Sequence, residues 1–152
     1  MMICAPKMMC YNRAMTDKSK KDNYFKSIAY CGLICDLCFR RNECDGCRQI
    51  NNICERNCSI DGCYQKNCCS DKKINGCWEC DDIYECSEGI YSAGDFSKIK
   101  AFAICIKEDG PERFIKYVLK NMETGWSVEK GRDYDGKTIK EILSMLRSGV
   151  KQ

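Results

Sequence analysis

The chain has 152 residues, of which 16 are cysteine and none is histidine. So much cysteine is typical of a scaffold held together by disulfides or metal ions. Without histidine the chain cannot form a Cys₂His₂ or Cys₃His zinc site, a Rieske cluster or a histidine-based catalytic pair. The length predicts a single domain, and no apolar run is long enough to predict a membrane span.

Charge divides the chain into three parts. Residues 1–30 hold six basic and two acidic side chains, residues 31–90 hold seven and eleven, and residues 91–152 hold twelve and nine. We therefore expect a basic, flexible tail over 1–28 and an acidic cysteine-rich module over 29–90. A helical segment over 91–152 should pack on this module, since neither part has enough apolar surface alone.

The tail shows neither a helical nor a strand period, and its run from Thr16 to Asn23 predicts solvated chain. Met15 is a second candidate for the translation start, a hypothesis that the native amino terminus would test. Nothing in the tail resembles a signal peptide, which predicts a cytoplasmic protein. In a reducing compartment closely spaced cysteines bind metal more often than they form disulfides.

Thirteen cysteines lie between Cys31 and Cys86, and they include three Cys-x-x-Cys pairs, at 35/38, 44/47 and 77/80. This spacing allows two thiolates on one tight turn to bind one ion. Asp45-Gly46 inside one pair and Asn75-Gly76 before another supply turn-forming residues. Three such pairs among flanking cysteines indicate metal binding far more strongly than one pair does.

Tetrahedral thiolate sites suit zinc or iron–sulfur clusters. We expect two or more zinc ions with a structural role, because a segment with so few large apolar residues cannot fold unaided. An iron–sulfur cluster is the alternative. Cys31-x₃-Cys35-x₂-Cys38 has radical-SAM spacing, but the chain is short for that class and matches neither ferredoxin spacing.

Four cysteine motifs follow one another in the order Tyr30-Cys31-Gly32-Leu33-Ile34-Cys35-Asp36-Leu37-Cys38, Cys44-Asp45-Gly46-Cys47-Arg48, Cys63-x₄-Cys68 and Cys77-x₂-Cys80-x₅-Cys86. Together they resemble a bacterial and archaeal family, domain of unknown function 3795. The resemblance covers about residues 29–90. It implies a small metal-binding domain without an established reaction. The implied metal ligands are Cys31, Cys35, Cys38, Cys44, Cys47, Cys63, Cys68, Cys77, Cys80 and Cys86.

Two features depart from the family pattern. Glu85 stands where the family often has proline, and Cys54, Cys58 and Cys69 are additional, as extra ligands or as free thiols. Ten cysteines do not divide evenly into four-cysteine sites. Bridging sulfurs, a non-ligand thiol and a third centre all remain open.

Three amphipathic helices are expected after the module. Their apolar stripes are Ile99, Phe102, Ala103 and Ile106, then Phe114, Ile115, Val118, Leu119 and Met122, and finally Ile139, Ile142, Leu143 and Leu146. Pro111 predicts a helix start, and Thr138-x-x-Glu141 predicts a capping box. Cys105 is expected to be a buried apolar side chain. The predicted fold is an irregular cysteine-knuckle module followed by short α-helices, with little or no β-structure.

These features favour a non-enzymatic zinc protein that serves as a protein-interaction or regulatory module, with an iron–sulfur protein for electron transfer or redox sensing as the alternative. The acidic module argues against a nucleic-acid partner. Candidate anchors for a protein partner are Trp78, Tyr84, Tyr91 and Trp126, each more often a core residue. Carboxylates near Cys80 (Glu79, Asp81, Asp82 and Glu85) offer a catalytic alternative, but a solvated acidic loop is the favoured interpretation.

Overall fold

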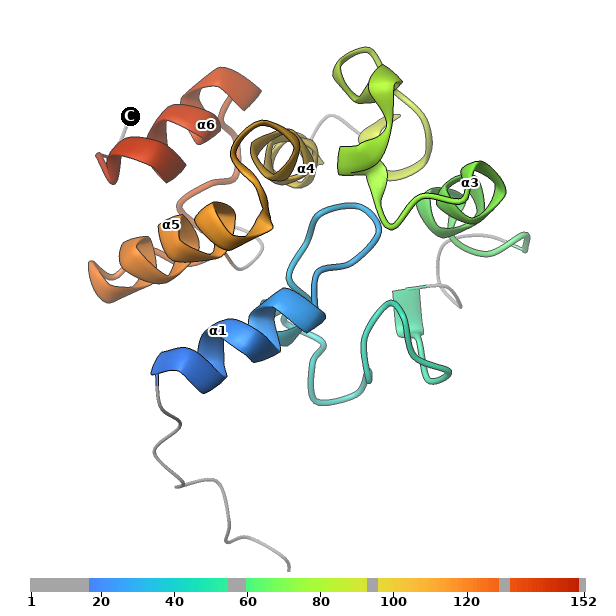
Figure 1. Cartoon of the computed structure of the whole chain (residues 1–152), viewed down its shortest axis with the longest axis horizontal. Coiled ribbons are helices and arrows are strands. Elements are labelled where there is room, and N and C mark those ends of the chain that lie inside the picture. The colour runs from blue at the N-terminus through green and yellow to red at the C-terminus, as the bar shows by residue number, and fades with distance from the viewer. Residues whose placement is uncertain (1–16, 55–59, 93–95, 129–131, 151–152) are drawn as a thin grey trace, which may run out of the picture.

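The computed structural model describes residues 17–54, 60–92, 96–128 and 132–150, and these residues are mostly helical (Figure 1). Within them β-pairing is limited to one isolated bridge between Ile28 and Ile34. The α-helices are α1 (Asp17–Lys26), α3 (Tyr64–Lys72), α4 (Ser97–Asp109), α5 (Pro111–Glu123) and α6 (Ile139–Ser148). Short 3-10 helices are η1 (Cys35–Leu37), η2 (Cys77–Glu79), η3 (Asp81–Tyr84) and η4 (Gly89–Ser92). The predicted helical fold with little β-structure is confirmed over the described residues.

The three carboxyl-terminal helices form where the apolar stripes predict them. Pro111 is the first residue of α5. The capping box at the start of α6 is also present, because the Glu141 N–H donates to Thr138 Oγ1 over 3.3 Å and the Thr138 N–H donates to Glu141 Oε2 over 2.7 Å. Gly149 ends α6 in the left-handed conformation that glycine adopts most readily.

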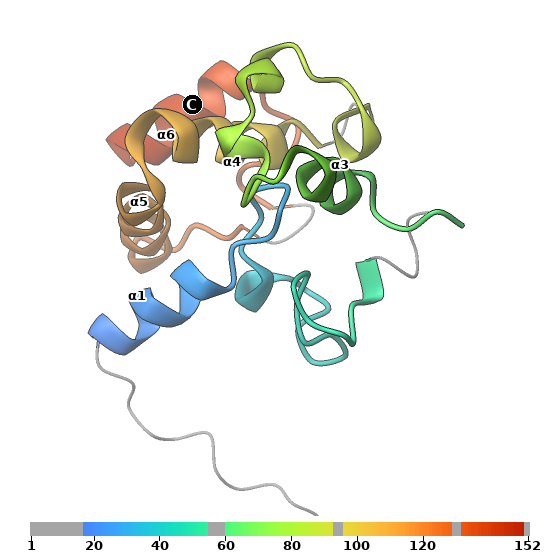
Figure 2. The same cartoon turned by 45° about the vertical axis from the view of Figure 1, so that its right-hand side comes forward.

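Helix α4 occupies the centre of the fold, between α5 and α6 on one side and the 3-10 turns of the cysteine-rich segment on the other (Figures 1 and 2). Phe102 on α4 packs against Phe114 and Tyr134, with ring centroids 5.1 Å and 5.7 Å apart. Each such aromatic pair contributes on the order of 1 kcal/mol beyond its buried area. Cys105 is 0% exposed, which confirms it as a core residue.

The segment that the sequence predicts to be solvated chain differs in the structure, because Asp17–Lys26 forms helix α1. This helix has almost no apolar stripe, so periodicity does not reveal it. Its anchor is Tyr24, which packs against the buried core, and α1 lies alongside α5 (Figures 1 and 2). Tertiary contact stabilises this helix. The rest of the tail, with Cys4, Cys10 and Met15, lies outside the described residues.

The cysteine-rich segment shares its core with the helices. Ile28 and Ile34 are buried in the same cluster as α4, α5 and α6, and Ile83 is buried with Ile104 in a second cluster. Gly32 approaches α4 so closely that a Cβ at this position would lie 2.7 Å from the backbone nitrogen of Ala103. Only glycine fits there. The loop that carries the first cysteines is therefore seated directly on α4.

Candidate metal centre

Two of the three Cys-x-x-Cys pairs form the same one-turn structure. Cys35 begins η1 and Cys77 begins η2. In each turn the backbone N–H of the second cysteine donates to the carbonyl oxygen of the first, over 3.0 Å for Cys38 and 3.1 Å for Cys80. The tight turns that the spacing predicts are present at both pairs.

The third pair lies against the first. Gly46 adopts a φ of +107°, which a residue with a side chain rarely adopts, and the hydrogen-bonded turn begins at this residue, where the Gln49 N–H donates to the Gly46 carbonyl oxygen over 3.0 Å. The Cys47 N–H then donates to Cys35 Sγ over 3.3 Å. A backbone N–H directed at sulfur stabilises a thiolate, and it is a common feature of cysteine metal sites.

Around this contact lies a set of thiols that we name the first cysteine group: Cys35, Cys38, Cys44, Cys47 and Cys54. The Ile53 N–H donates to Cys44 Sγ over 3.4 Å. Burial raises the pKa of the Cys35 thiol to about 12, and the neighbouring charges of Cys47, Cys54 and Cys38 add to this rise. At neutral pH this thiol stays protonated unless a cation replaces the proton.

A second set of thiols gathers around α3 and the turns η2 and η3. We name it the second cysteine group: Cys68, Cys69, Cys77, Cys80 and Cys86. The sulfurs of Cys69 and Cys77 lie 3.8 Å apart, and both residues are buried. Either thiol can donate the hydrogen bond between them, and this bond lowers the pKa of Cys77 and raises that of Cys69.

Two further cysteines lie near these groups. Burial raises the pKa of Cys31, and the charges of Cys47, Cys35 and Cys77 add to this rise. The Tyr91 hydroxyl donates to the Cys31 carbonyl oxygen over 2.8 Å. Cys63 is the residue before α3, and its charge reaches Cys47. Cys58 lies outside the described residues.

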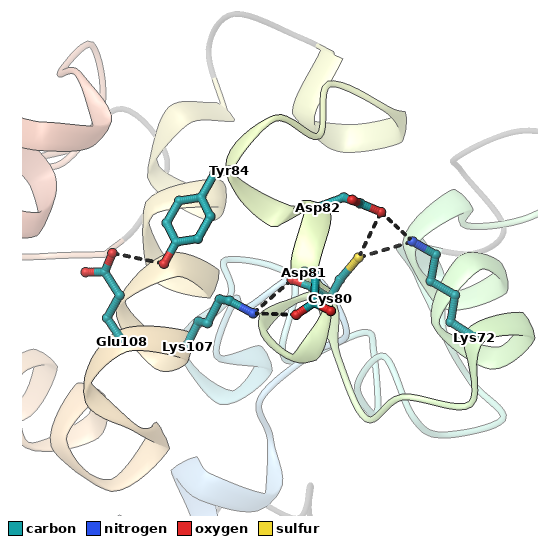
Figure 3. Close-up of polar contacts among 7 residues, drawn as sticks. All are labelled: Lys72, Cys80, Asp81, Asp82, Tyr84, Lys107 and Glu108. Carbon is teal, nitrogen blue, oxygen red and sulfur yellow. Dashed lines mark hydrogen bonds and ion pairs between the residues drawn. The ribbon is translucent and has the colours of Figure 1, made fainter.

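Lysines surround the turn that carries Cys80 (Figure 3). Lys72 on α3 places its ammonium 3.1 Å from Cys80 Sγ and 3.4 Å from an oxygen of Asp82. Lys107 on α4 donates to the Cys80 carbonyl oxygen over 3.1 Å and lies 3.6 Å from a carboxylate oxygen of Asp81. Ammonium groups from α3 and α4 therefore both contact this turn.

Helix α4 holds the far end of the same loop through Lys100, whose ammonium donates to the carbonyl oxygens of Tyr84 and Cys86 over 2.7 Å and 2.8 Å. The sequence interpretation missed Lys100 and Lys107. One sequence feature could have revealed these two lysines: they share a helix face with Ile104, an apolar residue outside the predicted stripe. Ile104 packs against the second cysteine group.

The carboxylates near Cys80 have structural partners. Glu79 accepts from the backbone and side-chain nitrogens of Asn75, over 2.8 Å and 2.9 Å, and these bonds lower its pKa. Asp82 pairs with Lys72. The contacts of Glu79 and Asp82 fix turns and balance charge.

Three of the four aromatic candidate anchors contact the core. Trp78 and Trp126 pack against the main cluster, and Tyr91 packs against the second. Tyr84 is 46% exposed, although its hydroxyl donates to Glu108 over 3.2 Å (Figure 3). As the sequence interpretation expects, most of these aromatics lie against the core.

The donor set suits zinc in kind, since every candidate ligand is a thiol. None of the 13 cysteines that the structure describes forms a disulfide. Zinc–sulfur bonds of about 2.3 Å in a tetrahedron place two ligand sulfurs about 3.8 Å apart, which is the separation between Cys69 and Cys77. Over the described ranges, however, no three Cys, Asp or Glu side chains converge closely enough to hold an ion.

Each cysteine group borders one surface cleft. Cys35 and Cys47 line a cleft of about 210 Å³ together with Asp36, Asp45 and Arg48. Cys68 lines the other, of about 420 Å³, together with Asp71 and Lys72. Of the second cysteine group, only Cys68 lines this cleft.

No family model, curated protein or solved structure matches the chain. The likeness to domain of unknown function 3795 therefore stays a prediction. None of the helices in the described part of the chain has the length and apolar character needed to cross a membrane.

Proposed function

We propose that this chain is a non-enzymatic zinc-binding protein in which cysteine thiolates hold two or more structural ions and support a protein-interaction or regulatory module. The observation that carries the proposal is that cysteines distant in sequence come together, at Cys35 with Cys47 in the first cysteine group and at Cys69 with Cys77 in the second. Each group has at least four thiols, enough for a four-thiolate site. The resemblance to domain of unknown function 3795 implies the same kind of domain.

A bound metal ion would stabilise the cysteine-rich segment. Cys35 and Cys38 lie on the single turn η1, and Cys77 and Cys80 on the single turn η2. A structural zinc ion supplies about 10–16 kcal/mol of apparent binding free energy in small peptides. On binding, the cysteines of each group would lose their thiol protons and close around the ion as thiolates. Lys72, at Cys80, would balance part of the two negative charges of a zinc ion with four thiolates.

An iron–sulfur protein for electron transfer or redox sensing is the second candidate. It is favoured by the Cys31-x₃-Cys35-x₂-Cys38 spacing and by the N–H···S bond from Cys47 to Cys35, because such bonds raise the reduction potential of a cluster. Zinc is preferred because the remaining cysteines follow neither common ferredoxin spacing.

Purification without added metal separates the two candidates. The zinc proposal expects colourless protein that contains two or more zinc ions per chain by elemental analysis. Anaerobically purified brown protein, with iron and acid-labile sulfide and broad absorption near 400 nm, would favour the cluster instead. Folded protein without metal would contradict both.

The interaction part of the proposal is supported by apolar side chains on the loops of the first cysteine group. Phe39 is 63% exposed, and Ile50 is fully exposed. A photoreactive residue placed at position 39 or 50 should crosslink to a protein in cells, while one at the exposed Val150 should not. Equal crosslinking at all three positions, or adducts removed by nuclease, would contradict a protein partner at these loops.

A further inference from the structure

Helix α3 carries two consecutive cysteines that face different surroundings. Successive residues of an α-helix point about 100° apart, so Cys68 and Cys69 cannot both face one centre equally well. Cys69 is 1% exposed and belongs to the buried cluster with Cys77, Ile83 and Ile104. Cys68 is only half-buried and lines the larger cleft with Asp71 and Lys72.

The distance between the sulfurs of Cys69 and Cys77 is informative. At 3.8 Å it equals the edge of a zinc–thiolate tetrahedron, about 3.8 Å, and it is far longer than the roughly 2.05 Å of a disulfide. The pair is thus placed as two ligands of one ion would be, and both residues belong to the buried cluster that includes Ala103 and Ile104 of α4.

We propose that Cys69 and Cys77 bind the same metal ion, with Cys80 and Cys86 as the other two ligands and Cys68 outside the site. This inference rests on the proposed metal-binding function and deepens it. It reverses the assignment that the family resemblance implies, in which Cys68 is a ligand and Cys69 is left over.

Helix α4 supports this ligand set. Cys80 follows Cys77 across the single turn η2, and Lys107 holds the Cys80 carbonyl oxygen. Lys100 holds the Cys86 carbonyl oxygen. Both lysines therefore fix, from one helix face, the backbone of the two ligands that do not belong to the Cys69–Cys77 pair.

The charges also fit. An ion with two positive charges and four thiolates has a net charge of −2, and the Lys72 ammonium lies 3.1 Å from Cys80 Sγ, one of the four sulfurs. Lys107 adds a second positive charge, at the backbone of the same residue. Because Lys72 also pairs with Asp82 and Lys107 with Asp81, the two lysines offset part of the charge of a dianionic site at this place.

The adjacent cysteines provide a matched pair of variants, Cys69→Ser and Cys68→Ser. Zinc per chain is measured by elemental analysis of each full-length protein after purification without added metal. We expect Cys68→Ser to keep the wild-type zinc content and Cys69→Ser to lose one ion per chain. Equal zinc in both variants, or loss in Cys68→Ser alone, would overturn the assignment while the proposed function stands. Wild-type protein that folds without metal would overturn both.

Because Cys69→Ser removes a buried residue and can prevent folding, a second measurement uses the wild-type chain. Alkylation of the zinc-loaded protein, mapped by mass spectrometry, should label Cys68 and spare Cys69 and Cys77 until a chelator removes the ion. Cys105, buried but outside the site, reports global unfolding. Protection of Cys68 with early labelling of Cys69, or a Cys69–Cys77 disulfide in zinc-loaded protein, would overturn the proposal.

Discussion

The ammonium of Lys107 lies 3.1 Å from the carbonyl oxygen of Cys80, a contact between the central helix α4 and a residue 27 positions earlier in the chain. The lysine side chain is only 23% exposed, so this contact is shielded from much of the solvent. Because α4 is also the centre of the apolar core, the position of the second cysteine group depends on the helices. Folding of the core and preparation of the metal site are therefore coupled.

This coupling predicts that Lys107→Met destabilises the protein although methionine retains an apolar stem. Loss of a hydrogen bond from a charged donor should lower the free energy of unfolding by about 1.5–3 kcal/mol. Chemical denaturation of the zinc-loaded protein measures the change. Lys116→Met, at an exposed position on α5, is the control, and an equal loss in the two variants would refute a specific role for Lys107.

The second prediction concerns Lys72 and metal affinity. Lys72→Gln removes the cation at Cys80 Sγ and should weaken zinc binding by about 10-fold, as loss of groups next to metal ligands commonly does. The measurement is a competition with a zinc-binding dye. The neighbouring exposed Lys73 provides the control variant Lys73→Gln. An equal loss of zinc affinity in both variants would indicate that the overall positive charge, and not the contact between Lys72 and the Cys80 sulfur, sets the affinity.

The third prediction concerns the close contact between α4 and the loop that carries the first cysteines. Gly32 and Gly136 both have positive φ, of +100° and +72°, but a Cβ at Gly136 would meet nothing within 4 Å. Gly136→Ala should therefore cost only the backbone strain of about 1–2 kcal/mol. Gly32→Ala should cost about 1–3 kcal/mol more, because the methyl group forces the loop away from Ala103. Thermal denaturation of both variants checks this, and similar losses of stability would contradict the close packing.

The fourth prediction concerns the ligands themselves. Cys77→Ser and Cys80→Ser should each unfold the cysteine-rich segment, because a metal site that loses a ligand no longer supports its turns. Limited proteolysis should then cut within residues 60–92. Cys105→Ala, which changes a buried cysteine on α4, should keep its metal and resist cleavage there. A wild-type cleavage pattern for both serine variants would contradict a structural site.

The fifth prediction follows from the capping box of α6. Hydrogen bonds from the Thr138 backbone and hydroxyl lower the pKa of Glu141 below its ordinary 4.5. A depressed carboxyl pKa stabilises the fold fully above the ordinary value and loses this contribution as pH falls through the lower one. The wild-type protein should thus melt above Glu141→Gln at neutral pH, and the difference should vanish well below pH 4.5. A difference independent of pH would show that the carboxylate charge is not involved.

The sequence predicted α4, α5 and α6 because each has a local signal: an apolar stripe, Pro111, and the pair Thr138 and Glu141. It did not predict α1, because that helix has no apolar period and depends on Tyr24 meeting a core built from distant residues. Local pattern determines a helix only when the helix carries its own apolar face.

The candidate site also has some features that local sequence predicts and others that depend on tertiary contact. Spacing identified the cysteines and the turns at Cys35 and Cys77, since these depend on neighbouring residues. Spacing could not show that Cys69, rather than Cys68, lies beside Cys77, because that depends on the rotation of α3. The contacts of Lys100 and Lys107 likewise require α4 to be docked on the cysteine loops.

The central claim is that bound metal holds the cysteine-rich segment. Its most direct test is hydrogen exchange on the full chain before and after a chelator removes the metal, with native mass spectrometry counting the ions lost. The account predicts that loss of two or more zinc ions coincides with loss of protection across residues 31–86 and, because this segment shares its core with the helices, with weaker protection of α4. Unchanged protection across residues 31–86 after complete metal removal would contradict it.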